Sequence, residues 1–156
     1  MSNNLYIGYL ADHQEALPTL EHLFESEWAA YYGPTGPGDA QQDLLAYSNH
    51  GQLPVGVVAF LGAEPCGVAA LKADSIATHK HLTPWIGGAM VAPQFRRKGI
   101  GARLVAALEG VARDLGFTNL YAGTSTANSL LIREGWQLLE VVQYEGESVS
   151  IYEKAL

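Results

Sequence analysis

The strongest chemical signal in the sequence is the segment Arg96–Gly101, which reads Arg-Arg-Lys-Gly-Ile-Gly. An apolar helical stripe starts at Ile100, so the glycines stand where a helix should begin. A helix start leaves its first backbone N–H groups unpaired and carries partial positive charge, and glycine lets a phosphate approach the backbone closely. The segment therefore predicts a pyrophosphate-binding site. The plain alternative is a solvated run of charges ahead of a helix.

Other chemistries fit the sequence less well. A dinucleotide-binding motif needs a third small residue after Gly99-x-Gly101, where Leu104 stands, and a P-loop needs Gly-Lys-Ser/Thr. A hydrolase nucleophile at Ser125 requires a later histidine, but all five histidines precede it. The triplet at 79–81, His-Lys-His, has no acidic or thiol partner nearby, so no metal site is expected.

The elements that must position the loop follow from hydrophobic periodicity. The clearest helix covers 99–116, and the strand before it covers 85–92. Gly87-Gly88 inside that strand predicts a bulge or a close approach by a ligand. The other expected elements are strands at 5–10, 55–61, 66–72, 120–124, 136–144 and 148–154, and helices at 15–32, 39–48 and 128–134. Together they fit one domain over residues 1–156.

Composition narrows the function classes. The net charge of -7 argues against a nucleic-acid partner, because a phosphate backbone needs a basic face. The apolar runs are too short to cross a bilayer, so no membrane partner is expected. The first residues lack the basic region of a signal peptide, and Cys66 is the only cysteine. These features predict a cytoplasmic protein without an internal disulfide, and they leave a homodimer open.

The motif Arg96-x-x-Gly99-x-Gly101 resembles the (Gln/Arg)-x-x-Gly-x-(Gly/Ala) signature of the GNAT N-acetyltransferase superfamily, and the similarity covers nearly the whole chain. The segment 130–136 looks like the family's Tyr-Glu-Lys-Leu-Gly-Phe/Trp segment, and 149–156 looks like its last strand. The resemblance implies an α/β fold with a mixed central sheet of about seven strands flanked by four helices. It also implies acetyl transfer from acetyl-CoA to an amine.

The resemblance further implies the cofactor contacts, in a cleft between strands 85–92 and 120–124. Met90 and Val91 match positions whose backbone pairs with the pantetheine arm, and Asn128 matches an asparagine that often contacts it. The amides that match the pyrophosphate cradle belong to Arg96, Arg97, Lys98, Gly99, Ile100, Gly101 and Ala102. The Gly87-Gly88 bulge would help to open the sheet for the cofactor.

One position departs from the family, because Leu131 stands where a tyrosine often protonates the leaving thiolate. Either Tyr121, Tyr144 or water supplies the proton, or no protein acid is needed, since a thiol pKa is about 8.5. Glu27 is a candidate for removing the proton from the amine, although a solvated helix position explains it equally well. Leu131 also supports an alternative function, a non-catalytic acyl-CoA-binding module, and a third alternative is an interaction domain that binds no CoA.

The charge split suggests the acceptor class. Residues 1–71 hold eight acidic residues and no Lys or Arg, while the remainder holds eight acidic and all nine basic residues. In the family this first part builds the acceptor side, so the expected acceptor is a cationic small molecule or peptide. The alternative is that these acids only solvate helix faces. Trp28, Tyr31 and Tyr32 are candidates to line the acceptor pocket.

Overall fold

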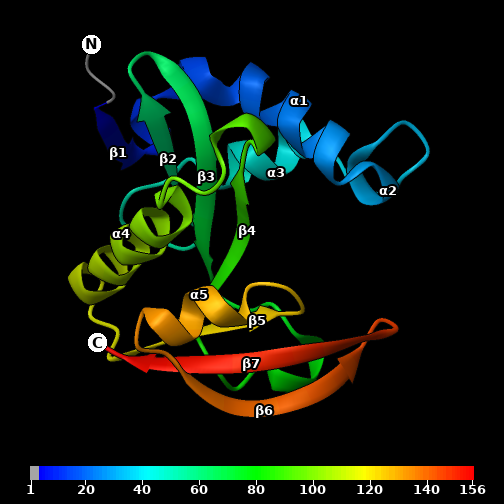
Figure 1. Cartoon of the computed structure of the whole chain (residues 1–156), viewed down its shortest axis with the longest axis vertical. Coiled ribbons are helices and arrows are strands. Elements are labelled where there is room, and N and C mark those ends of the chain that lie inside the picture. Colours follow the sequence, from blue (N-terminus) through cyan, green and yellow to red (C-terminus); the bar gives the residue numbers. More distant parts are fainter. Residues whose placement is uncertain (1–3) are drawn as a thin grey trace.

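The computed structural model describes residues 4–156, which form one seven-stranded sheet with helices on both faces (Figure 1). The strands lie in the order β1-β2-β3-β4-β5-β7-β6. β4 and β5 are parallel, and every other neighbouring pair is antiparallel. The strands are β1 Leu5–Tyr9, β2 Val55–Leu61, β3 Glu64–Lys72, β4 Trp85–Val91, β5 Asn119–Thr124, β6 Gln137–Tyr144 and β7 Glu147–Ala155. The predicted α/β fold with a mixed sheet of about seven strands is confirmed.

Two helical layers cover the sheet because successive strand residues point to opposite faces. In β2, Val57 packs into the core beneath α4, whereas Val58 packs into the core beneath α1 and α3. Apolar residues repeat on one face of α4, and Ile100, Leu104 and Leu108 are buried there. The helices are α1 Leu17–Glu27, α2 Ala29–Tyr32, α3 Ala40–Ala46, α4 Ile100–Asp114 and α5 Asn128–Arg133.

The first expected helix is interrupted, so the described residues contain five α-helices where four were predicted. Trp28 leaves helical geometry, with φ -119° and ψ 50°, and separates α1 from α2. The Trp28 ring packs against Phe24 with ring centroids 4.9 Å apart, and it also lies beside Tyr32. The periodicity of apolar residues continues through the break, which is why the sequence indicated one helix.

The glycine pair in β4 forms the predicted bulge. Val68 pairs with Met90 and Ala70 pairs with Gly87, so β4 contains one extra residue between these two pairs. Gly88 has φ +57°, which glycine adopts without steric cost, and an added Cβ would lie 3.2 Å from the Tyr47 ring. The bulge therefore bends β4 at the level where it leaves its parallel partner.

β4 and β5 stay paired over only two positions, Trp85 with Tyr121 and Ile86 with Ala122. Beyond Ile86 the two strands diverge. Figure 1 shows the part of the sheet from β1 to β4 rotated strongly relative to β6 and β7. An opening between parallel strands exposes backbone groups that an unbroken sheet would use, and this opening defines the candidate site.

Candidate active site

A cavity of about 250 Å³ lies where β4 and β5 separate. Its walls come from β4 and β5, from Val105 of α4, from Leu130 and Leu131 of α5, and from Trp28 between α1 and α2. The strand residues that line it are small or apolar, namely Ile86, Gly87, Gly88, Ala89, Ala122, Gly123 and Thr124. No described residue with a charged side chain lines it, so the cavity suits a narrow, uncharged arm of a ligand.

The backbone of β4 presents hydrogen-bonding groups to this opening. Ala92 N–H donates to the Cys66 carbonyl of β3, and alternate residues of a strand direct their backbone groups to the same side. Met90 therefore directs its N–H and carbonyl toward β3, while Val91 directs its own toward the cleft. The Val91 carbonyl accepts a hydrogen bond from Arg96 Nε at 3.0 Å, which is consistent with this orientation. Of the two positions predicted to meet the pantetheine arm, Val91 has the better-placed backbone.

The start of α4 offers a set of unused donors. Its N-cap Gly99 has φ +78° and supplies no side-chain hydrogen bond. Among residues 4–156, no backbone carbonyl or side chain accepts a hydrogen bond from the amides of residues 97–102. By contrast, Asp39 caps the start of α3 through Gln42 N–H at 3.1 Å. Unpaired amides at a fifteen-residue helix attract an anion through their N–H groups and the helix dipole.

Gly101 faces the space that a phosphate would need. The nearest atom to a Cβ placed on Gly101 is Leu130 Cδ2 of α5, at 3.7 Å, so the protein itself would accept a side chain there. No atom of the protein requires a glycine at this position, and the Gly101 amide is one of the six unpaired amides of residues 97–102. The missing side chain therefore leaves room for a ligand between α4 and α5. Of the cradle predicted for Arg96–Ala102, the amides of residues 97–102 are arranged to suit a pyrophosphate, whereas the Arg96 N–H donates to the Pro93 carbonyl at 3.3 Å.

The three cations of the loop do not act alike. Arg97 adopts a left-handed conformation with φ +65°, which is unfavourable for a residue with a side chain and turns the loop sharply into α4. Arg96 directs its guanidinium away from the helix start, toward Glu27, with Nη2 donating to Oε1 at 3.0 Å. Arg96 therefore links the loop to the end of α1.

Glu27, the expected proton acceptor, lies at the last position of α1, directly before Trp28. Its side chain is 27% exposed, and its ion pair with Arg96 spans 69 residues of sequence. Because Trp28 lines the cleft, Glu27 lies near the cleft mouth. The structure therefore places a carboxylate at the cleft mouth and holds it in an ion pair with Arg96.

Asn128 is oriented by a residue that the sequence did not single out. Tyr152 of β7 is 3% exposed, and its hydroxyl donates to Asn128 Oδ1 at 2.7 Å. The bond occupies Oδ1 and leaves Nδ2, for which the described residues supply no acceptor, available to a ligand. In the sequence, Tyr152 is one residue of an alternating strand pattern. Its role in orienting Asn128 becomes visible only from the hydrogen bond between the two side chains, which are 24 residues apart.

Tyr144 lies outside the described cleft lining and packs with a separate cluster around Trp85, Tyr121 and Ile151. Tyr121, the other tyrosine considered as an acid, donates to Glu153 Oε2 at 3.2 Å. Burial, followed by that hydrogen bond, raises the pKa of Tyr121 above its ordinary value. Leu131 is 4% exposed and lines the cleft, so the position of the family's tyrosine faces the site but carries no acid.

Neither a metal site nor a membrane-spanning helix is found in the described part of the chain. No group of three His, Cys, Asp or Glu side chains within residues 4–156 is arranged to hold a metal ion. No helix in the same range combines the length and the apolar composition that spanning a bilayer requires.

Solved structures share this fold at low sequence identity. The chain aligns with an aminoglycoside 6′-N-acetyltransferase complexed with coenzyme A at a TM-score of 0.74 and 15% identity, covering 96% of each chain. The aminoglycoside 6′-N-acetyltransferase from Enterococcus faecium aligns at a TM-score of 0.76 and 14% identity, also covering 96% of each chain. The ribosomal L7/L12 alpha-N-protein acetyltransferase in complex with coenzyme A aligns at 0.72 and 16%, covering 99% of this chain and 96% of that one. No curated protein matches the sequence.

A family model described as the acetyltransferase (GNAT) family matches residues 18–133. The matched range runs from α1 through α5 and contains Glu27, the bulged strand β4, the amides of the α4 start and Asn128. It covers well over half of the sequence, and it includes both walls of the cleft. The chain therefore belongs to the GNAT acetyltransferase family and is an acyltransferase by that membership.

Proposed function

We propose that this protein transfers the acetyl group of acetyl-CoA to a primary amine on a cationic acceptor. One observation carries the proposal: an uncapped helix start with six unpaired amides opens beside a narrow apolar cleft between diverging parallel strands. The first feature suits a pyrophosphate and the second suits the pantetheine arm that follows it. The bound coenzyme A named for two of the similar structures agrees with this assignment.

Acetyl-CoA supplies an activated thioester, and the residues of this chain position it and the amine. The amine nitrogen forms a bond to the carbonyl carbon, the carbon–sulfur bond breaks, the nitrogen loses a proton and the sulfur gains one. The N–H group of Val91, on the edge of β4 that faces away from β3, is placed to stabilise charge on the acetyl oxygen. Glu27 takes the amine proton after leaving Arg96. Tyr144 and Tyr121 pack in the same cluster and neither lines the cleft, so water is the favoured acid and both tyrosines stay predictions.

Acids and aromatic rings on the α1–α3 side support a cationic acceptor. Trp28 is 36% exposed and Tyr31 is 52% exposed, and ring faces of this kind attract ammonium groups. Glu25, Tyr32 and Asp39 line a neighbouring cavity of about 350 Å³. Residues 1–71 contain no Lys or Arg, so Arg96 at Glu27 is the cation that an ion pair brings to α1, and the excess of acids on this side concentrates cations.

The test is a transfer assay with acetyl-CoA and matched primary amines of rising positive charge, including an aminoglycoside, a polyamine and a neutral amine. Acetylated product is measured by mass spectrometry at low and high salt. We expect kcat/KM to rise with acceptor charge at low salt and the difference to shrink at high salt, because salt screens exposed charges. A preference for neutral or acidic amines at low salt would remove the cationic acceptor from the proposal.

A second candidate function, a non-catalytic acyl-CoA-binding module, is favoured only by Leu131. A Leu131→Tyr variant tests it, since Leu131 lines the cleft and a hydroxyl there would supply the family's usual proton donor. If transfer occurs, the variant should change the pH profile of kcat and leave the affinity for CoA within about twofold. Tight CoA binding without transfer to any amine, in both proteins, would favour the module.

Several predictions from the sequence belong to the same proposal. A cytoplasmic location agrees with the use of acetyl-CoA and with a single cysteine, which is buried. A single domain over residues 1–156, the lack of a nucleic-acid partner and the open choice between monomer and homodimer stay predictions.

A further inference from the structure

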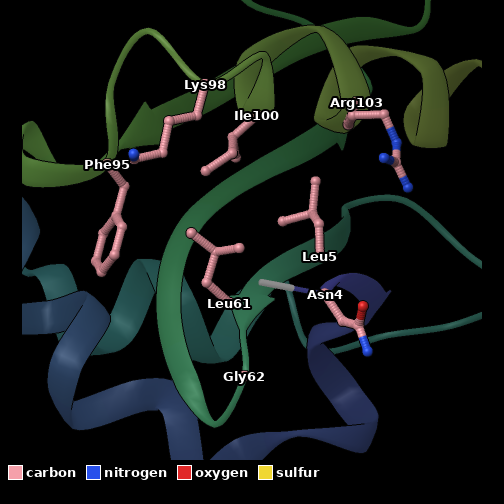
Figure 2. Close-up of a pocket in the computed structure, with 8 residues that line it drawn as sticks. All are labelled: Asn4, Leu5, Leu61, Gly62, Phe95, Lys98, Ile100 and Arg103. Atoms are coloured by element: carbon pink, nitrogen blue, oxygen red, sulfur yellow. The ribbon is translucent and has the colours of Figure 1, made fainter. Parts of the chain in front are cut away.

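A second cavity, of about 650 Å³, lies between the start of α4 and the ends of β1 and β2. Figure 2 shows Leu5, Leu61 and Ile100 pointing into the same space from three different elements. Phe95, from the loop before α4, adds an aromatic wall. The volume is within the range of cavities that bind small organic molecules. The mechanism proposed above makes no use of this cavity.

The cavity lies on the other side of α4 from the cofactor cradle. Gly101 faces Leu130 of α5, which also lines the cleft between β4 and β5. Ile100, the preceding residue, points about 100° away around the helix and faces Leu5 and Leu61 instead. A ligand in this cavity would therefore contact α4 without occupying the space between α4 and α5.

Two cations border the apolar wall. Lys98 and Arg103 line the cavity on either side of Ile100 (Figure 2), and both are exposed. Within the described part of the chain, no carboxylate pairs with either side chain, and no Asp or Glu lines the cavity. In a protein of net charge -7, two unpaired cations around one apolar cavity are a distinctive local arrangement.

We propose that this cavity is a second ligand site, separate from the acetyl-CoA site, for a small organic anion with an apolar body. The apolar wall of Leu5, Leu61, Ile100 and Phe95 takes the hydrocarbon part, and Arg103, beside Leu5, takes the anionic head; Lys98 adds positive charge on the other side of Ile100. An aromatic or branched aliphatic carboxylate has this chemistry. Inorganic phosphate lacks the apolar part, and a neutral amide of the same shape lacks the charge.

The probe is 4-phenylbutanoate, compared with 4-phenylbutanamide and inorganic phosphate at constant ionic strength. Each is titrated into the full chain saturated with CoA, and binding is followed by amide chemical shifts in an ¹⁵N NMR spectrum. The protein used is the full chain with no added tag, because an N-terminal tag would lie close in sequence to Asn4, which lines the cavity. We expect the carboxylate to bind with a Kd of about a millimolar, a reasonable value for a ligand of this size. The largest shifts should fall on Leu61, Gly62 and Arg103.

Variants separate this site from general anion binding. Arg103→Gln should weaken binding of the carboxylate about tenfold, while Arg133→Gln, an exposed cation at the end of α5, should leave it unchanged. Leu61→Trp should fill the cavity and abolish binding, and Arg103→Gln keeps the test valid if that variant folds poorly. Equal binding of acid and amide, no binding of the carboxylate to the CoA-saturated chain, or equal effects of the two arginine variants would overturn the proposal.

Discussion

The Gly101→Val variant separates cofactor binding from folding. Gly101 lies in the first turn of α4, and a Cβ there meets only Leu130, at an ordinary contact distance of 3.7 Å. Valine is as good a helix residue as glycine or slightly better, so the free energy of unfolding should change by no more than about 0.5 kcal/mol. The added side chain instead occupies the space through which a phosphate reaches the amides.

The expected loss of affinity follows from the donors that become inaccessible. A hydrogen bond to a charged group contributes about 1.5–3 kcal/mol, and a branched side chain at Gly101 should block roughly two of them. The lost binding energy is therefore about 3 kcal/mol or more, which is a rise in Kd of about 100-fold or more. Gly101→Ala should stay within about tenfold of the unmodified protein, because the family motif allows alanine here.

Gly110→Val is the matched control, since Gly110 lies in the same helix and no heavy atom lies within 4 Å of its added Cβ. Calorimetric titration with CoA measures Kd for the variants, and thermal unfolding without ligand measures their stability. We expect similar melting temperatures for both valine variants and loss of CoA binding in Gly101→Val alone. If Gly101→Val bound CoA within threefold of the unmodified protein, the pyrophosphate would have to lie elsewhere.

Three further outcomes are expected. Glu27→Gln should lower kcat/KM for the amine by about 100-fold or more with little change in CoA affinity. Arg96→Gln keeps the Glu27 carboxylate, so its kcat/KM should fall much less. Equal losses of kcat/KM in the two variants would indicate that only the ion pair matters. Tyr152→Phe should raise the Kd for CoA by about two- to tenfold and Asn128→Ala should not add to it, as a double-mutant cycle by calorimetry would show. Burial, with the nearby Asp43 carboxylate as a smaller cause, raises the pKa of Tyr47 to about 12, so the stability that its neutral form gives below about pH 10 should be lost as pH rises toward 12. Tyr47→Phe should reduce that alkaline loss in urea unfolding at pH 9 and pH 11.5, and an unchanged pH dependence would contradict the assignment.

The parts of the site that depend on neighbouring residues were predictable from the sequence. The helix start near Ile100 and the bulge at Gly87-Gly88 each follow from local rules of helix termini and glycine geometry. The left-handed conformation of the N-cap Gly99 does not, because an N-cap residue is usually extended. The mixed sheet of about seven strands came from resemblance to a family rather than from periodicity. The break at Trp28 was missed because apolar spacing reports which face is buried but not whether the backbone hydrogen bonds continue.

The parts that depend on contacts across the fold were not predictable. Glu27 and Arg96 are 69 residues apart, and only the packing of α1 beside the β4–α4 loop brings their charges to 3.0 Å. Arg96 appeared from its motif to serve the pyrophosphate, yet its guanidinium also binds the Val91 carbonyl that faces the pantetheine cleft. One side chain thus contacts both the backbone expected to hold the donor and the carboxylate expected to accept the proton of the amine. Binding of the pantetheine arm at Val91 would compete with Arg96 and release Glu27, so occupation of the donor site should precede activation of the amine.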